Sequence, residues 1–426
     1  MQQISAENHV LRCMLLDDRH TAEQLATHFL VAMDTRKIDK ARCHHVVRDN
    51  AANIAKCFRD LEISSSGCFA HSLPLALNDG ILSQRYVTDM LAVSRRLVGH
   101  FKHSSSATAR LHQFQAQLNM PNHQLVQDVS TSRWNSSYYM MQRLLEQRQA
   151  LALYAVENNL DGLSSNQWDV LKNVVGLLAP FEEATTYVSS NAVCISDSIP
   201  VLAGLRKRLQ NSENDTGVKT IKAALLDALS ARFQLNDKPE YTVATLLDPR
   251  YKNRFFSDIE SQAVTHIVKA KLVAIQTQRD TALTGDTEGE PVLKKPRLGN
   301  AESSGSLFDC VDDLLDSSSQ DAQSESATTP TSTTVVQDGN MEFARYMAEP
   351  LLSRTSDMLA WWRDNKGRFP LMASVARTYL GAPPSRVPSE RLFSTAGGVI
   401  TEHRTRLLPE NAEKLIFMKF NGDLLK

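Results

Sequence analysis

An aspartate ends a short apolar run in the stretch CHHVVRDNAANIAKCF, residues 43–58. The β-branched residues before Asp49 predict a buried strand, and open α/β sheets place their ligands at the carboxyl ends of strands. Asp49 is therefore a candidate site residue. It is equally well placed as the N-cap of the helix expected to follow, because an Asp side chain accepts hydrogen bonds from the first backbone N–H groups of a helix. The stretch alone leaves the two interpretations equal.

Cys68 and His71 form a Cys-x-x-His pair. Thiol and imidazole are zinc-ligand types, but a structural zinc site takes four ligands, and no second pair has a matching spacing. A packed cysteine beside a hydrogen-bonded histidine is the other interpretation.

Arg133 and Trp134 place a cation next to a large aromatic face. Such a pair can stack on a nucleic-acid base. A tryptophan in a helical protein also belongs in a core, and both interpretations stay open.

A basic stretch without Asp or Glu runs over residues 91–127 and includes Arg95, Arg96 and Lys102. It is a candidate surface for phosphate groups. A solvated basic helix face is the alternative.

The elements that would position these residues alternate over the first 80 residues. Strands are expected at 9–17 and 43–48, and a strand or helix start at 67–77, with helical patterns between them. This β-α-β-α-β order favours a parallel or mixed sheet. From about residue 81 to residue 280 the pattern is helical throughout.

Residues 281–340 hold eleven acidic and three basic residues and few apolar ones. Such a segment cannot bury enough apolar surface to offset its ordering entropy, so a disordered acidic linker is expected. Within it, residues 307–316 (LFDCVDDLLD) are either a helix that docks on a partner or a mildly apolar patch. The cluster from Lys294 to Arg297 (KKPR) is either a nuclear localisation signal or a chance cluster.

The composition of the 426-residue chain is that of a soluble globular protein, with 42% apolar and 22% charged residues. No apolar run approaches the length of a membrane span, and MQQISAENHV does not resemble a secretory signal. Six scattered cysteines fit a reduced intracellular compartment. Outside the acidic linker the charge is mildly positive, which is compatible with nucleic-acid binding.

Five motifs follow one another in the chain: RDNAANI, GCFAH, STSRWNSSYYMMQRLLEQR, ATLLDPRYK and PSERLFSTAGGVITEHRTRLLPENAEKLIFMKFN. The series resembles the hAT family of transposases and their domesticated relatives, most of all the BED-zinc-finger type. The resemblance runs from about residue 9 to residue 421, interrupted by the linker, and the last motif is the most specific.

The resemblance implies an α/β fold: an incomplete ribonuclease H-like core interrupted by a large all-α insertion, mostly helical overall. It implies a partial core over 1–80, a helical insertion over 81–280, the linker over 281–340, and a C-terminal dimerisation region over 341–426 that contributes the last core helix.

In this family three acids hold two divalent metals, which activate water and then a DNA 3′-hydroxyl. Paired metals stabilise the entering and leaving oxygens of such a displacement, and Mg²⁺ prefers oxygen ligands. Asp49 matches the second acid and Glu390, in PSERLF, the third, so the resemblance implies Mg²⁺ if the site is complete. Glu390 could instead only complement a helix dipole. Cys68 and His71 match a pair beside the acids, and Arg133 and Trp134 match the family's Arg-Trp.

The first acid has no match in this sequence. The family carries it on the first core strand, in an Asp-Gly-Trp-x-Ser type stretch, and this chain is expected to begin after that strand and without a BED finger. The two carboxylates Asp49 and Glu390 can bind Mg²⁺ weakly but do not hold a metal pair, so we expect no catalytic activity.

The C-terminal segment matches the family's dimerisation region and predicts a homodimer or a hAT-family heterodimer. Its apolar side chains exceed what one helix needs to dock once, although they could equally pack on the chain's own core. They are Leu407, Leu408, Leu415, Ile416, Met418 and Phe420.

The sequence thus predicts a transposase-derived nuclear protein without catalytic activity, which acts through dimerisation and through DNA or chromatin binding, with no membrane association. The alternative is an active hAT transposase of which this sequence is an N-terminally incomplete part.

Overall fold

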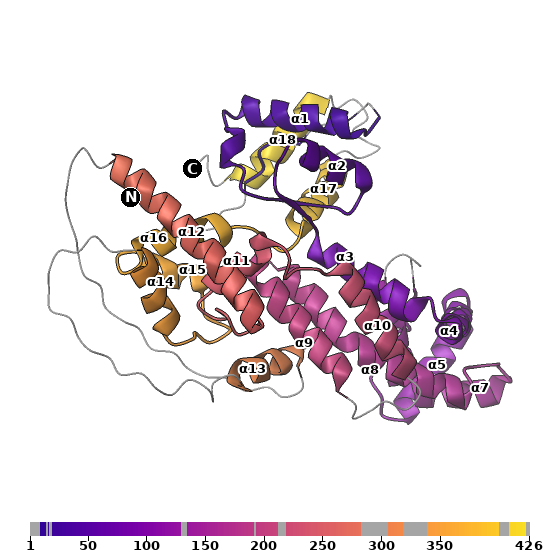
Figure 1. The fold of residues 1–426 in the computed structure, drawn as a ribbon. Helices are drawn as coiled ribbons and strands as arrows, with labels where there is room; N and C mark the ends of the chain where they lie inside the picture. The colour runs from indigo at the N-terminus through magenta and orange to yellow at the C-terminus, as the bar shows by residue number, and fades with distance from the viewer. Residues whose placement is uncertain are drawn as a thin grey trace. The chain divides into compact units, whose positions relative to one another are not determined.

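The computed structural model describes residues 9–13, 16, 19–128, 134–190, 193–211, 219–282, 306–317, 339–399 and 409–422. The chain forms two compact units. Unit 1 draws on residues 1–71, 187–203 and 235–426, and unit 2 on residues 72–186 and 204–234. Both units are built mainly from helices (Figure 1). The domain ranges drawn from the sequence stay a prediction.

A two-stranded parallel sheet lies in unit 1. Strand β1 (Val46–Arg48) pairs with strand β2 (Ser65–Gly67), and helix α2 (Ala52–Asp60) connects them. No third strand joins this sheet in the described part of the chain. The strand predicted at 43–48 and the helix after it are confirmed, and the two strands are parallel, as their βαβ order predicts.

The strand predicted at 9–17 is wrong in its described part, residues 9–13 and 16, which contain no strand. The backbone N–H of Val10 donates to Asn421 Oδ1 (3.0 Å), and Asn421 Nδ2 donates to the carbonyl of Val10 (2.8 Å). One buried side-chain amide thus pairs with both backbone groups of Val10. The local apolar pattern could not reveal this, because the partner lies 411 residues away.

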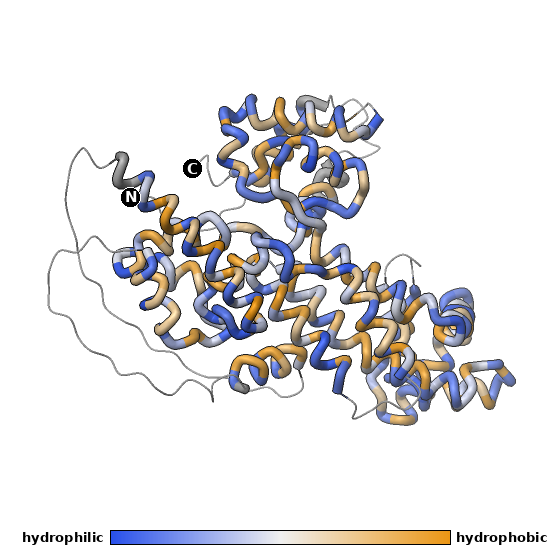
Figure 2. The backbone as a smooth tube through the Cα atoms, in the orientation of Figure 1, coloured by the Kyte–Doolittle hydropathy of each residue, from blue (hydrophilic) through white to orange (hydrophobic). Residues whose placement is uncertain are grey.

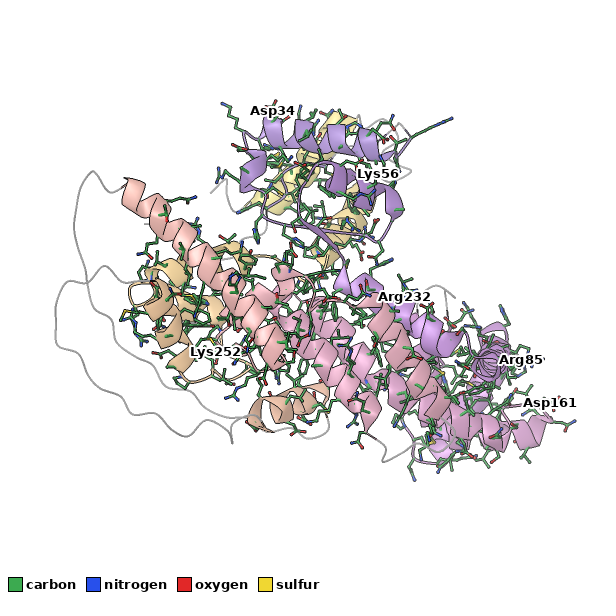
Figure 3. The ribbon with its side chains drawn as sticks, in the orientation of Figure 1. Asp34, Lys56, Arg85, Asp161, Arg232 and Lys252 are labelled. Atoms are coloured by element: carbon green, nitrogen blue, oxygen red, sulfur yellow. The ribbon has the colours of Figure 1, made fainter. Side chains whose placement is uncertain are left out.

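Three further helices belong with α2 and the sheet: α1 (Ala22–Thr35), α17 (Val387–Val399) and α18 (Pro409–Asn421). Helix α1 packs on α2, and α17 packs on α18 (Figure 1). Lys56, labelled in Figure 3, reaches from α2 to Glu23 on α1 at 2.6 Å. Leu392 of α17 and Ile416 of α18 form a small buried cluster.

The rest of unit 1 is a helical layer around α11 (Pro239–Leu247), α12 (Asp258–Ala282), α14 (Gly339–Ala348), α15 (Met358–Asn365) and α16 (Pro370–Tyr379). An aromatic group ties it together. Trp362 Nε1 donates to the carbonyl of Leu247 (2.9 Å), and Tyr346 stacks on Trp362 with 5.2 Å between ring centroids. Lys252, labelled in Figure 3, is buried here and donates to the carbonyl of Tyr346 (2.8 Å).

Unit 2 contains α4 (Arg85–His103), α5 (Ser105–Gln117), α6 (Trp134–Glu146), α7 (Arg148–Asn158) and α10 (Lys219–Arg232), with parts of α8 (Ser165–Val188) and α9 (Ser198–Gln210). Hydrophobic and hydrophilic positions alternate along these helices in Figure 2, as expected for amphipathic helices. A Cβ atom on Gly80 would lie 2.7 Å from Leu225 Cδ2, so the short π-helical segment Asn78–Leu82 approaches α10 closely only because residue 80 is glycine.

The chain is thus mostly helical, with two short strands. None of the helices described is both long and apolar enough to span a bilayer.

Candidate functional site

Asp49 directly follows β1, as predicted, and its two carboxylate oxygens have different partners. Oδ1 accepts the backbone N–H of Ala51 at 3.0 Å. Because Ala51 is itself the N-cap of α2, Asp49 forms the turn before the helix and does not cap it. Oδ2 accepts Nη1 of Arg386 at 3.3 Å. One oxygen therefore supports the local fold, and the other reaches a residue far away in the sequence.

Glu390 lies in the first turn of α17, one helical turn after Arg386. Arg386 Nε donates to Glu390 Oε1 at 2.9 Å, while its Nη1 binds Asp49. Asp49 and Glu390 are 341 positions apart in the sequence. Both nevertheless contact the guanidinium of Arg386. Arg386 was not singled out in the sequence. Its one detectable signal is the i,i+4 spacing to Glu390, which favours an ion pair on a helix.

This acidic site does not fit a pair of metal ions. Mg²⁺ needs several oxygen ligands around it, whereas the two carboxylates share a cation that the chain itself supplies. No cluster of three or more His, Cys, Asp or Glu side chains within the described ranges is arranged to hold a metal. The arrangement supports structure at the start of α17.

Cys68 adjoins this site without forming a ligand pair with His71. Its buried Sγ accepts the backbone N–H of Arg386 at 3.4 Å, whereas the His71 side chain is exposed. Burial raises the pKa of the Cys68 thiol, so the reactive thiolate is disfavoured. The geometry agrees with the interpretation of Cys68 as a packed cysteine that helps to fix the backbone at Arg386.

A basic pocket of about 710 Å³ lies in unit 1 between residues 9–12, residues 42–47 and the start of α17. Arg12, Arg42, Arg386 and Arg391 line it, and none of its lining residues is an Asp or a Glu. Arg386 pairs with Asp49 and Glu390, and Arg12 with Glu413, so the lining favours anionic groups less than four arginines suggest.

Trp134 begins α6 and is only 1% exposed, so its indole is part of the core of unit 2 and in this conformation offers no face to a base. Arg133 lies outside the described residues. The geometry therefore agrees with the core interpretation of Trp134.

The basic stretch at 91–127 is partly neutralised. Arg95 Nε and Nη2 each lie 2.8 Å from Asp128 Oδ2. Lys102 donates to Gln127, and Arg96 is exposed. The positive charge open to a ligand is thus smaller than the sequence suggests.

Asp128 binds side chains at the start of α6 and was missed in the sequence. Besides its contact with Arg95, the Asp128 carboxylate accepts hydrogen bonds from Ser136 Oγ at 2.6 Å and from Ser137 Oγ at 2.8 Å. Burial by itself would raise the pKa of Asp128, but the hydrogen bonds from Ser136, Ser137 and Arg95 outweigh burial and lower it. An acid shortly before an Arg-Trp motif and followed by several Ser residues is the only signal that could have revealed this role.

Helix α18 uses its apolar residues on two sides. Ala412 and Ile416 are buried, and Ile416 packs with Leu392, Val10 and Cys13 of the same chain. Leu415 and Met418 point outward, with 44% and 56% exposed, and Phe420 lines the basic pocket. Leu407 and Leu408 lie outside the described residues.

Two family models match the chain. The hAT family C-terminal dimerisation region matches residues 342–421, which include α17 and α18. The ZBED1 RNase-like helical domain matches residues 66–177, which begin in β2 and continue through α7 into α8.

Curated relatives match over much of the chain. Zinc finger BED domain-containing protein 4 of Homo sapiens is 31% identical over 384 residues, which are 89% of this chain and 31% of that protein. Zinc finger BED domain-containing protein 6 of Mus musculus is 29% identical over 411 residues, 88% of this chain and 39% of that protein. The putative AC transposase of Zea mays is 23% identical over 413 residues, 92% of this chain and 48% of that protein.

The chain spans less than half the length of each of these relatives. The matches cover residues of both units. The chain is a hAT-transposase-related protein with BED-type homologues, and it carries a hAT C-terminal dimerisation region and a ZBED1 RNase-like helical domain.

Proposed function

We propose that this transposase-derived protein acts by self-association through its C-terminal region, as a homodimer or with another hAT-family chain, and not by cutting DNA. The observation that carries the proposal is the outward-facing pair Leu415 and Met418. A neighbouring side of α18 is already packed through Ala412 and Ile416, so this pair is not needed to hold the helix in place. The match of residues 342–421 to a dimerisation region supports a second chain as the partner.

The size of the expected effect follows from burial. Each such side chain contributes about 1.5–3 kcal/mol when it is fully removed from water. In a two-fold symmetric dimer each residue enters the interface twice, so a change at one position is felt twice.

We expect Leu415→Asp to weaken self-association at least tenfold, because it removes two apolar contacts and places two carboxylates in the interface. Sedimentation equilibrium of the full chain measures the dissociation constant. Val156→Asp is the matched control, since Val156 is 86% exposed on α7 in unit 2 and should leave association unchanged. An unchanged dimer in Leu415→Asp, or equal weakening in both variants, would move the interface away from α18.

For the fold, we propose that the parallel strand pair and the helices around it correspond to an incomplete ribonuclease H-like core. Support comes from the acid at the end of β1 meeting Glu390 of α17 through Arg386. The same proximity favours a second candidate function, metal-dependent DNA cleavage, in which the acids would act once further ligands are added.

We expect the full chain to leave transposon-end DNA uncut in Mg²⁺ or Mn²⁺, because Arg386 occupies both carboxylates and no further acid joins them within the described residues. A gel assay on end-labelled duplex DNA reports cutting and retention in one experiment. Cleavage that is lost in Glu390→Gln would replace this proposal with the second candidate.

We also propose that the protein associates with DNA or chromatin in the nucleus. The basic pocket, whose lining includes Arg42 and Arg391, supports the DNA contact. The KKPR cluster at 294–297, outside the described residues, is the sequence feature behind the nuclear location. Absence of retained DNA in the gel assay at low salt would contradict the DNA contact.

A further inference from the structure

Helix α13 (Leu307–Ser317) forms within the acidic segment and packs on the body of the chain. Leu307, Val311 and Leu315, spaced four residues apart, are 1%, 1% and 8% exposed. Hydrophobic positions recur along α13 in Figure 2. Two interpretations were open for residues 307–316, a helix that docks on a partner and a mildly apolar patch in a disordered linker. The structure has a helix there, and its apolar face is buried within its own chain.

The start of α13 is closed by its own side chains. Ser306 Oγ accepts the backbone N–H of Phe308 at 3.1 Å, and Asp309 Oδ2 accepts the backbone N–H of Ser306 at 2.7 Å. These reciprocal bonds resemble a capping box, which satisfies two donors at a helix start. The segment thus encodes a helix locally, before any docking.

Docking is centred on Arg354 and Tyr187 of unit 1. The ring centroids of Phe308 and Tyr187 are 4.6 Å apart, and the Arg354 guanidinium lies 4.2 Å from the centroid of the Phe308 ring. Arg354 Nε also lies 3.2 Å from Asp312 Oδ1. One arginine therefore contacts both an aromatic and an acidic residue of the helix, a combination of cation–π and ionic contact.

The pattern that this surface recognises can be read from α13. It consists of three apolar anchors at i, i+4 and i+8, an aromatic at i+1 and a carboxylate at i+5, on a helix that holds four Asp and no Lys or Arg. Amphipathic helices that bind grooves on other proteins use anchors of similar spacing. Tyr187 and Arg354 also line a pocket of about 560 Å³ next to the docked helix.

We propose that the Tyr187–Arg354 surface is a docking site for an acidic amphipathic helix of a partner protein, and that α13 is the occupant that competes with the partner from within the same chain. Because residues 283–305 and 318–338 connect α13 to α12 and α14, its docking is intramolecular. A tethered ligand acts at an effective concentration on the order of 1 mM. A partner helix therefore binds only when it outcompetes α13 or when α13 is released. The proposal is independent of self-association through α18.

The test uses the full chain and a fluorescein-labelled peptide of residues 306–317. The double variant Val311→Asp/Leu315→Asp removes two anchors of α13 but leaves Tyr187 and Arg354 intact. We expect this open variant to bind the peptide at least tenfold more tightly than the unmodified chain, by fluorescence anisotropy. Adding Arg354→Glu should abolish the gain, because it removes the cation and repels Asp312.

Two peptides serve as controls. A peptide with Val311→Asp and Leu315→Asp should not bind, whereas one with Asp316→Asn, a change on the exposed side, should bind as the unmodified peptide does. Phe308→Ala in the full chain is a milder release variant, should the double variant not fold. It removes only the contact to Tyr187 and Arg354 and should give intermediate binding.

Three results would overturn the proposal. The first is that a release variant melts cooperatively but does not bind the peptide. The second is that binding survives Arg354→Glu. The third is that the unmodified chain and the release variants bind the peptide equally.

Discussion

Arg250→Ala is expected to lower the free energy of unfolding of unit 1 by about 3–5 kcal/mol. Arg250 is buried and pairs with two buried carboxylates, at 2.7 Å from Asp248 Oδ2 and 3.1 Å from Asp197 Oδ1. Burial alone would lower the pKa of the guanidinium, but Asp248 and Asp197 raise it, so the charge persists. Removing the arginine leaves two buried carboxylates without a cation.

The rest of the network explains why the loss cannot be repaired locally. The hydroxyls of Tyr187 and Tyr251 each donate a hydrogen bond to Asp197 Oδ1, at 2.9 and 2.6 Å. Ser196 Oγ donates a hydrogen bond to Asp248 Oδ2 at 2.7 Å. These neutral donors orient the carboxylates without balancing their charge. Removal of a cation from a buried ion-pair network is one of the few single substitutions that lower the free energy of unfolding by several kcal/mol.

Peptide-resolved hydrogen exchange measures the effect where it arises, since unit 1 and unit 2 can open separately. Amides of α11 should exchange faster in Arg250→Ala. Arg59→Ala is the control, because Arg59 is 75% exposed and 3.9 Å from Asp60, a geometry that contributes little. A change below about 1 kcal/mol in Arg250→Ala would mean that the buried network does not hold unit 1 together.

Asp128→Ala is expected to destabilise unit 2 by about 2–4 kcal/mol near neutral pH. The carboxylate is 1% exposed and accepts hydrogen bonds from Arg95, Ser136 and Ser137, so its removal takes away the buried acceptor that joins α4 to the start of α6. Asp128→Asn keeps the shape and removes the charge, and it should retain part of the stability.

The pH dependence follows from the lowered pKa of Asp128. A carboxyl group whose pKa is lower in the folded state stabilises the fold above its unfolded pKa, about 3.9, and loses that contribution as the pH falls through the folded value. The difference between the unmodified chain and Asp128→Asn should therefore be constant from pH 5 to 7 and shrink below about pH 4. Urea unfolding followed by hydrogen exchange in α6 measures it. A difference that persists undiminished at the lowest accessible pH would show that charge is not the cause.

The sequence could predict the elements next to Asp49 because their signals are local. A β-branched run predicts β1, and the periodic residues after it predict α2. It could not predict that Arg386 would join Asp49 to Glu390, since this contact depends on how segments 337 positions apart pack. The same reason explains Val10, whose partner is the side chain of Asn421.

Some residues had two open interpretations in the sequence. Their packing in the structure favours one of the two, and a single sequence does not show how each side chain packs. The residue type of Trp134 is compatible with a core position and with a binding surface. Its burial in the structure favours the core position. Residues 307–316 had a helical apolar face in the sequence, but the identity of its partner, Arg354 and Tyr187 of the same chain, needed the fold. On α18 the sequence showed an excess of apolar residues, and only the structure separates Ile416, which is buried, from Leu415 and Met418.

We propose that the chain works as a dimer built on α18. The fold determines which sample can test this proposal. Ending the chain at residue 340 would not be a clean test. Residues after that point complete unit 1: Tyr346 Oη donates to the carbonyl of Leu246 (3.0 Å), Trp362 Nε1 donates to the carbonyl of Leu247 (2.9 Å), and Ile416 packs with Val10. The unmodified full chain is the right sample.

The most direct measurement is therefore the solution mass of the full chain by light scattering after size exclusion, over a range of loading concentrations. We expect a mass near twice the 47.5 kDa of one chain, falling toward that of the monomer on dilution. A well-folded species at 47.5 kDa at every concentration would contradict it.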